Sequence, residues 1–311
     1  VVIGGGAGGM LECEPVYRDY LLKADRASAY SRFASFGCAS TADRIADRLG
    51  LMGPKTTFMT ACSSGATAIG FARDLIQTNM APVVICGGTE PLCRVTYAAF
   101  NALQAVDPEY CKPFDKNRQG LSLGEGAGIM ILEAWSHARR RGARIYAELL
   151  GYGISCDAHH MTAPDPEGDG AALAMQRALE DAGVSTEAVD YINAHGTATP
   201  ANDVMETKGI KTVFGPRAHH IPVSSTKSMI GHTLGAAGAI EGVAAVLAIH
   251  HHFIPPTIHH QTPDPQCDLD FVTEGARASD INIVLSNSFA FGGNNTAVVF
   301  GKFTDSGVSH A

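Results

Sequence analysis

The sequence lacks the features of several large classes of protein. Its eight cysteines include no Cys-x-x-Cys pair and no regular framework, which predicts reduced thiols and a cytoplasmic location rather than a disulfide-stapled secreted domain. A net charge of −8 at pH 7 leaves no general basic face for a nucleic acid. No uninterrupted apolar run reaches the roughly 18 residues of a membrane span, so no membrane is expected. What is left is a globular chain of 311 residues, long enough to bury a large core.

Glycine and alanine are abundant, and they follow a pattern. Short apolar runs, such as residues 83–86, 191–194 and 283–286, alternate with alanine-rich segments of helical period. The 34 glycines indicate tight turns and closely packed helices. This alternation predicts an α/β fold with largely parallel sheets.

The chain divides into two halves that resemble each other, residues 1–142 and 143–311. The basic stretch 139–144 marks the joint between them. Each half contains an apolar run, a polar turn with a reactive side chain and a Gly/Ala-rich helix, around Cys62 in the first and Lys227 in the second, which indicates an internal duplication. Because Val1 already lies in a strand-like run, we expect the first half to lack its N-terminal part.

Cys62 lies where a predicted strand gives way to a helix, in the segment TACSSG at residues 60–65. Free backbone N–H groups and the positive end of the helix dipole favour a thiolate there, and the thiolate is the nucleophilic form of cysteine. A free cysteine is also a common small apolar core residue. Cys62 alone therefore leaves both interpretations open.

Three further segments place polar residues directly after apolar runs. They contain His195, then Lys227 with His232, and finally Phe291. A lone histidine beside a turn is usually structural, but in open α/β sheets catalytic groups gather at the carboxyl ends of the strands. We therefore expect these side chains to meet at Cys62.

Four motifs together resemble the β-ketoacyl-acyl carrier protein synthases of the thiolase superfamily. They are TACSSG at 60–65, NAHGTAT at 193–199, SSTKSMIGH at 224–232 and NSFAFGGNN at 287–295, in the order of that family. The chain is most similar to the elongating Cys-His-His type of bacterial fatty-acid and polyketide systems. The resemblance implies a thiolase-like fold, in which two similar halves form a five-layer αβαβα body, and normally a homodimer, or a heterodimer in polyketide systems.

The resemblance also implies a reaction, the decarboxylative Claisen condensation. Cys62 would accept an acyl group, with the N–H groups of Cys62 and Phe291 holding the oxyanion. His195 and His232 would bind the malonyl thioester carbonyl and stabilise the enolate left when CO₂ departs. Attack of that carbanion on acyl-Cys62 lengthens the chain by two carbons. No separate cofactor is expected, because both substrates are bound as thioesters to the phosphopantetheine of acyl carrier protein.

Further residues take supporting roles by the same resemblance. Lys227 and Glu241 would form an ion pair behind the site, and Phe291 would gate it. Lys227 would bias the local charge rather than act as the nucleophile. The positions expected near the phosphopantetheine arm are Thr162, Thr197 and Thr199. The candidates for docking an acidic carrier are Lys23, Arg26 and Arg32.

Two patterns in the sequence suggest other functions. The run GGGAGG at 4–9 satisfies the dinucleotide fingerprint G-x-G-x-x-G, but Glu12 and Glu14 would face the pyrophosphate and Pro15 interrupts the following helix. In the family this turn borders the acyl pocket, and Ala7 stands where long-chain synthases often carry a bulky aliphatic residue, which predicts a roomier channel. The paired histidines (159–160, 219–220, 250–252 and 259–260) lack metal-ligand spacing, so no metal site is expected.

Two alternatives to an elongating enzyme stay open. A degradative thiolase would need a second catalytic cysteine in the C-terminal loop, where this chain has SFAFGG at 288–293. A non-elongating chain-length or priming partner of a polyketide synthase would resemble the enzyme but lose its cysteine, and Cys62 is present. Ala290 replaces a glycine usual in that loop, which predicts stiffer gating by Phe291.

Overall fold

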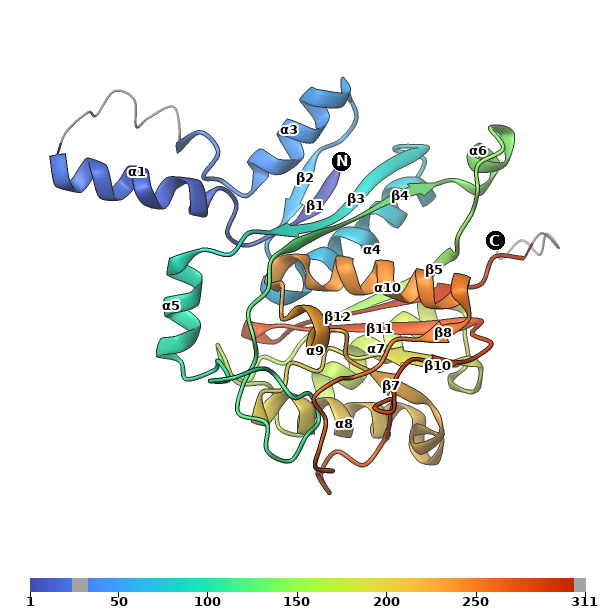
Figure 1. Ribbon diagram of the computed structural model, residues 1–311. Coiled ribbons are helices and arrows are strands. Elements are labelled where there is room, and N and C mark those ends of the chain that lie inside the picture. The colour runs from blue at the N-terminus through green and yellow to red at the C-terminus, as the bar shows by residue number, and fades with distance from the viewer. Residues whose placement is uncertain (24–32, 305–311) are drawn as a thin grey trace.

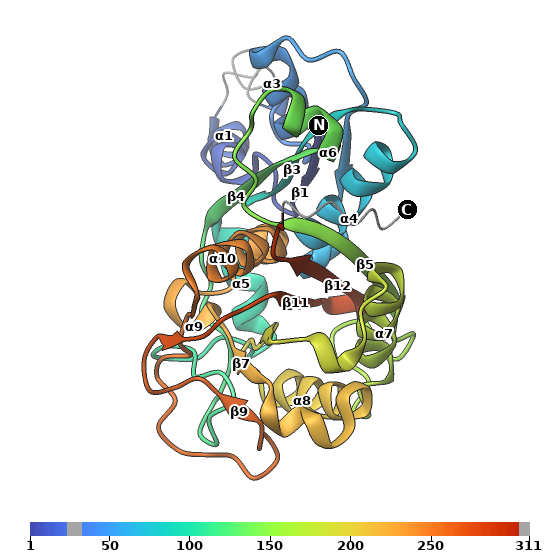
Figure 2. The same cartoon turned by 90° about the vertical axis from the view of Figure 1, so that its right-hand side faces the viewer.

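The computed structural model describes residues 1–23 and 33–304. Figures 1 and 2 show five layers. Helix α3 lies on the outer side of one sheet, and α1 extends to one side of it (Figure 1). Helices α4 and α10 fill the space between the two sheets, and α7 and α8 cover the outer face of the second sheet. The five-layer α/β architecture predicted from the sequence is confirmed.

The two sheets repeat one topology. The first has the strand order β2-β1-β3-β4 and the second has β5-β12-β11-β6-β7-β9. In the first sheet β1 pairs in parallel with β2 and β3, and β4 runs antiparallel to β3. In the second sheet β6 pairs in parallel with β7 and β11, and β12 runs antiparallel to β11. The order β2-β1-β3-β4 thus matches β7-β6-β11-β12, which agrees with an internal duplication.

The strands of the first sheet are β1 (Val2–Gly4), β2 (Thr56–Phe58), β3 (Val83–Glu90) and β4 (Gly126–Glu133). Those of the second are β5 (Glu148–Cys156), β6 (Tyr191–Asn193), β7 (Pro222–Ser224), β9 (Asp270–Phe271), β11 (Ile283–Phe289) and β12 (Asn294–Gly301), and β8 (Phe253–Ile254) pairs with β10 (Arg277–Ala278) outside it. The longest pairings, β3 with β4 and β11 with β12 and β5, are antiparallel. The expectation of largely parallel sheets is therefore wrong for the long strands.

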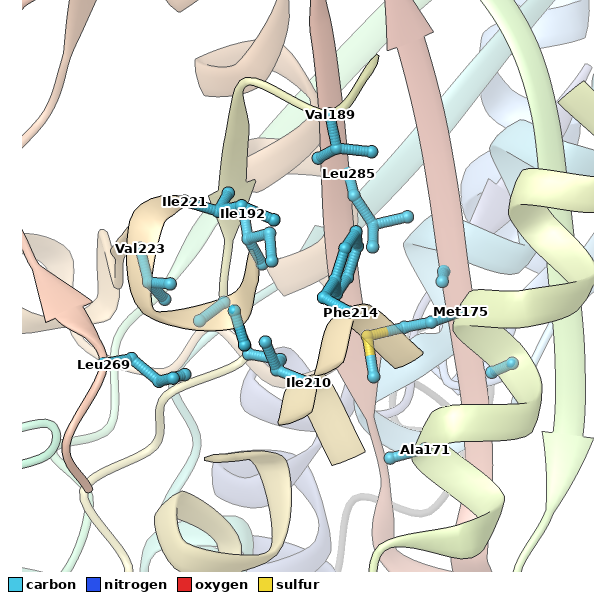
Figure 3. Packing of buried hydrophobic residues seen from close by; sticks show 14 of the residues in the cluster. Ala171, Met175, Val189, Ile192, Ile210, Phe214, Ile221, Val223, Leu269 and Leu285 are labelled. Carbon is cyan, nitrogen blue, oxygen red and sulfur yellow. The ribbon is translucent and has the colours of Figure 1, made fainter. Parts of the chain in front are cut away.

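The α-helices are α1 (Met10–Lys23), α3 (Ala39–Leu49), α4 (Ser64–Gln77), α5 (Arg94–Ala102), α6 (Trp135–Arg140), α7 (Asp169–Ala182), α8 (Pro200–Phe214), α9 (Lys227–Ile230) and α10 (Ala237–His251). Short 3₁₀ turns are η1 (Ala61–Ser63), η2 (Thr186–Ala188), η3 (Gly215–His220), η4 (Leu234–Ala236) and η5 (Phe291–Gly293). Figure 3 shows how Met175 of α7 and Ile210 and Phe214 of α8 pack with Ile192 and Leu285 of the second sheet.

Small residues let the two central helices approach each other. A Cβ added at Gly65 of α4 would lie 2.8 Å from the backbone N of Ala239, and one at Gly238 of α10 would lie 2.7 Å from the Cβ of Ala66. Both distances are shorter than a normal contact. The Gly/Ala richness of these helices therefore follows from their close packing between the sheets, and it brings the segments that precede α4 and α10 together.

The central helix bears on the membrane expectation. The helical stretch Leu234–His251 has a mean hydropathy of 1.4, so by length and composition alone it could cross a membrane. The expectation that no segment is long and apolar enough to span a membrane is therefore wrong, because this stretch is apolar on average although polar residues interrupt it. However, 56% of this stretch is buried between the sheets. A core helix explains its apolar character.

Candidate active site

Cys62 lies in η1, at the turn that joins β2 to α4, as predicted. Ala61 adopts a left-handed conformation there (φ 51°), and the Ser64 hydroxyl ties the turn together by accepting the Thr60 N–H at 2.9 Å and donating to the Ala61 carbonyl at 2.6 Å. The turn packs directly on β1, where a Cβ at Gly4 would lie 2.3 Å from the Ser64 carbonyl carbon. Cys62 is thereby held in place and buried, with 6% of its surface exposed.

The protonation state of Cys62 differs from the expectation. Burial raises the pKa of the thiol to about 11, although the Lys227 charge and the N–H of Phe291, which donates to the sulfur, both lower it. The expectation of a thiolate rested on the helix dipole, but desolvation has the larger effect on the pKa of this thiol. The resting site therefore holds a thiol, and a base must take its proton before it attacks.

Two histidines lie beside this thiol. His195 follows β6 and His232 follows α9, and a ring nitrogen from each, together with the Cys62 sulfur, lie within 4.8 Å of one another. Their ring centroids are 5.2 Å apart and nearly perpendicular, at 84°. Burial, followed by the Lys227 charge, lowers the pKa of both imidazoles well below the usual range. Both rings are therefore neutral at physiological pH.

The hydrogen bonds of His232 define its tautomer. Its Nδ1 accepts the backbone N–H of Leu234 at 3.2 Å, so the ring proton of the neutral imidazole must be on Nε2. His232 therefore presents an N–H donor from its other nitrogen. His195 is oriented through its backbone instead, and its buried Nδ1 has no hydrogen-bond partner within residues 1–23 and 33–304.

Lys227 and Glu241 form an ion pair behind the site. Lys227 begins α9, Glu241 lies in α10, and only 1% of each side chain is exposed. The ammonium acts electrostatically on Cys62, His195 and His232, lowering the pKa of each. Burial raises the pKa of Glu241, and Lys227 opposes that shift. The predicted pair is therefore in contact, and its charge acts on all three reactive groups.

Phe291, in the C-terminal loop, borders the site through its backbone N–H, which donates to the Cys62 sulfur. Its ring stacks on Phe100 of α5, with centroids 5.6 Å apart at 27°. Gly292 and Gly293 follow with φ of 78° and 72°, so the loop needs glycine there. Ala290 is extended (φ −121°, ψ 156°), a conformation open to every residue, so its Cβ causes no strain in this state. Stiffer gating stays a prediction about other conformations of the loop.

The three threonines lie on the loops around the histidines and Phe291. The Thr197 and Thr199 hydroxyls are 2.9 Å apart on the segment that follows His195. Thr162 donates its backbone N–H to His160 Nδ1 at 3.1 Å, and its neighbour Met161 accepts the N–H of Gly292 at 2.9 Å. All three positions therefore border segments that carry predicted site residues.

Glu90, at the end of β3, is a residue that the sequence reasoning missed. Its carboxylate is 2% exposed and accepts the N–H groups of Gly6 at 2.8 Å, Gly235 at 2.9 Å and Ala7. The glycine-rich turn thus binds a carboxylate of its own chain with N–H groups that a pyrophosphate would need. Ala7 is buried against this turn, which borders a cavity of about 440 Å³. An acid near the end of a strand-like run, in VVICGGTE at 83–90, is the signal that could have identified it.

Glu206 of α8 is a second missed residue. Its two oxygens accept the N–H groups of His195 at 2.8 Å and Gly196 at 2.7 Å. Burial raises the pKa of Glu206 to about 7, although these two N–H groups lower it. This carboxylate fixes the backbone of the His195 turn, which explains why that turn can hold φ of 38° at Gly196.

The described residues contain one cluster of side chains with the spacing of metal ligands, at a place that the sequence did not indicate. Within the described residues, the one group of three His, Cys, Asp or Glu side chains close enough to hold a metal is Cys62, His195 and His232. None of the paired histidines belongs to it.

Comparisons with known proteins identify the family. The model of the β-ketoacyl synthase N-terminal domain matches residues 1–138, and that of the C-terminal domain matches residues 146–261. A 3-oxoacyl-(acyl-carrier-protein) synthase 2 from Synechocystis sp. is 46% identical over 310 residues, which cover 97% of this chain and 74% of that protein. The chain belongs to the β-ketoacyl synthase family.

Other relatives of this β-ketoacyl synthase agree. The 3-oxoacyl-(acyl-carrier-protein) synthase 2 of Staphylococcus aureus is 44% identical, over 97% of this chain and 75% of its own. The ishigamide ketosynthase/chain length factor structure has a TM-score of 0.92 at 41% identity, and a β-ketoacyl synthase from Burkholderia phymatum has 0.90 at 36%, each covering 97% of this chain and 75% of the other. The synthase is therefore an acyltransferase-type condensing enzyme with a thiolase-like fold, as the motifs predicted.

Proposed function

We propose that this β-ketoacyl-acyl carrier protein synthase elongates an acyl chain held on Cys62 by two carbons, in fatty-acid or polyketide biosynthesis. The observation that supports these residue roles is one cluster: a buried thiol, two neutral imidazoles within 4.8 Å, and a buried ammonium that acts on all three. A binding protein without catalysis would have no use for that combination.

The first half-reaction loads Cys62. A neutral imidazole accepts the thiol proton, and the sulfur attacks the carbonyl of the acyl thioester. The N–H groups of Cys62 and Phe291 stabilise the oxyanion, and the Phe291 N–H already points at the sulfur. The carrier thiolate leaves and takes up the proton, so that one thioester is exchanged for another.

The second half-reaction forms the carbon–carbon bond. The malonyl thioester loses CO₂, and the electron pair moves into an enolate whose oxygen accepts hydrogen bonds from the Nε2–H of His232 and from His195. Neutral imidazoles with an N–H can donate in this way without giving up the proton. The enolate carbon attacks acyl-Cys62, and the Cys62 thiolate leaves beside Lys227, whose charge stabilises it.

The same proposal assigns residues to the path of the phosphopantetheine arm and names the partner protein. Thr162, Thr197 and Thr199 line the path of the phosphopantetheine, and Phe291 gates it. Acyl carrier protein is the partner, as in the structure of a type II polyketide acyl carrier protein with its ketosynthase (36% identity). Of the docking candidates, Arg26, Arg32 and the side chain of Lys23 lie outside the described residues. The enzyme needs no separate cofactor, since the carrier supplies the activated thioesters.

Assembly, domains and location complete the proposal. The chain forms a homodimer, or pairs with a chain length factor as in the Xenorhabdus doucetiae ketosynthase complex (35% identity). Residues 1–142 and 143–311 are its two halves. Its location is cytoplasmic, which is supported by the lack of a disulfide among the eight cysteines, all of which lie in the described part of the chain.

Mass spectrometry of Cys62 tests the proposed roles. With acyl-carrier and malonyl-carrier substrates, the wild type should form an acyl adduct on Cys62 and then a product longer by two carbons. H232A should keep the adduct and lose the product, while C156A, which alters an exposed cysteine, should behave as the wild type. No adduct would reject the enzyme hypothesis. An adduct without product in the wild type would point to a non-elongating priming partner.

Chain length is tested separately at Ala7. This small residue is buried in the turn held by Glu90, so a larger side chain must displace its surroundings. Ala7→Ile should shift the preference toward shorter acyl groups in competition between donors of different length. An unchanged preference would reject the idea of a roomier channel.

A further inference from the structure

We propose that Cys62, His195 and His232 form an inhibitory site for a borderline-soft divalent cation such as Zn²⁺, which competes with the acyl group for the same sulfur. The three donor atoms lie within 4.8 Å of one another, and none of the three residues is more than 6% exposed. The donor set of one thiolate and two imidazoles is one that zinc prefers.

The geometry needs only a small adjustment. Zinc binds sulfur at about 2.3 Å and imidazole nitrogen at about 2.0–2.1 Å in a tetrahedral arrangement, which places the donors roughly 3.3–3.6 Å apart. Side-chain movements on the order of 1 Å bring the cluster to that spacing. The fourth position stays open for water, which is typical of a site that is not purely structural.

The two imidazoles differ in how readily they can bind a metal. His232 accepts the Leu234 N–H at Nδ1 and carries its ring proton on Nε2, so binding through Nε2 requires that proton to move to Nδ1 and that hydrogen bond to be given up. The buried Nδ1 of His195 has no partner in the described part of the chain. The Cys62 thiol must also release its proton, to solvent, when the metal–sulfur bond forms.

Nearby charges oppose and favour a cation. The Lys227 ammonium repels it, but Glu241 is paired with that ammonium and Glu90 adds a second carboxylate whose field reaches Cys62. When both carboxylates are ionised, the surroundings of the sulfur carry one positive and two negative charges. Hard cations such as Mg²⁺ should not bind, because they require oxygen ligands and the cluster offers none.

Cobalt spectroscopy tests the site without depending on activity. Co²⁺ added to the metal-free purified chain should give tetrahedral visible bands and a thiolate-to-cobalt charge-transfer band, displaced by Zn²⁺ but not by Mg²⁺. C62A and enzyme acylated on Cys62 should lose the charge-transfer band. H232A should bind at least about tenfold more weakly, since even partners of metal ligands contribute that much. The controls C156A and H251A, both exposed, should match the wild type.

Lys227→Met should change the affinity for Co²⁺ in a direction that a chance contact between a cysteine and the metal would not produce. It removes the repelling charge, so it should tighten Co²⁺ binding although it lowers condensing activity. The proposal would be overturned if Co²⁺ gave octahedral bands and no tetrahedral ones, or if C62A kept an unchanged charge-transfer band. A protein that failed to condense acyl groups but gave the cobalt signature would reject the proposed function and keep the metal site, so the two can fail separately.

Discussion

Replacing Lys227 by Met should slow the reactions of Cys62 and destabilise the fold in a pH-dependent way. The ammonium lowers the pKa of the Cys62 thiol, so its loss raises that pKa above about 11. It is also the partner of Glu241, and only 1% of each side chain is exposed. One substitution therefore perturbs two quantities, the thiolate fraction and the free energy of unfolding, through the same buried charge.

The magnitudes follow from burial. With a pKa of about 11, roughly one Cys62 in a thousand is a thiolate at pH 8, and each further unit lowers that fraction about tenfold. Leaving Glu241 buried without its partner costs about 3–5 kcal/mol. Because burial raises the pKa of Glu241 and Lys227 no longer opposes it, the carboxyl can escape this cost by staying protonated. The destabilisation should thus be small near pH 4–5 and grow as the pH rises.

Two assays and a double variant separate these effects. The rate of Cys62 alkylation by iodoacetamide between about pH 7 and 10 measures the thiolate fraction, and urea denaturation at several pH values measures stability. K227M/E241Q should regain most of the stability and lose its pH dependence. Its alkylation should stay slower than that of the wild type, because Lys227 affects the pKa of Cys62 more than Glu241 does. Alkylation of K227M at the wild-type rate, or recovery of that rate in the double variant, would refute the electrostatic role of Lys227.

Three further predictions concern the supporting residues. The pKa of Glu206, about 7 in the fold, lies above the ordinary glutamate value of 4.5, so its contribution to stability is complete below about pH 4.5 and is lost as the pH rises to 7. Glu206→Gln should remove this slope, on the order of 3 kcal/mol, from unfolding free energies measured over that range. Phe100→Ala removes the ring stacked on Phe291, worth about 1 kcal/mol, and should speed Cys62 alkylation at fixed pH; an unchanged rate would mean that the stack does not limit access. Glu90→Gln puts an amide against three N–H groups and should lower stability by about 1–3 kcal/mol in urea denaturation, whereas Glu109→Gln on the surface should not.

The sequence was informative where chemistry is carried by motifs at the ends of strands. Cys62, His195, Lys227 and His232 were predicted to meet because each follows an apolar run, and parallel strands bring their carboxyl ends to one edge of a sheet. Strand direction was less predictable, since an apolar run looks the same in either orientation and the long pairs proved antiparallel.

The sequence was uninformative where a contact joins distant segments. Glu90 binds N–H groups that are 84 and 145 residues away, so its position at the end of a strand-like run does not show which groups it binds. Protonation was missed for a related reason. The sequence indicates the helix dipole at Cys62, but the desolvation that dominates the pKa of its thiol arises only when the folded chain buries it. Burial is a property of the assembled layers.

Burial also explains why thiol and imidazoles remain uncharged together. A thiolate–imidazolium pair would make Cys62 a faster nucleophile, but it would give one histidine a full charge in a site that already contains Lys227. In the proposed reaction the histidines must afterwards donate hydrogen bonds to an enolate, and an imidazolium would protonate that enolate rather than hold it for attack on acyl-Cys62. A site that forms carbon–carbon bonds through a carbanion therefore gains from neutral donors. The slow resting thiol is the consequence, and in the proposed mechanism Lys227 compensates for it by stabilising the thiolate when it forms and when it leaves.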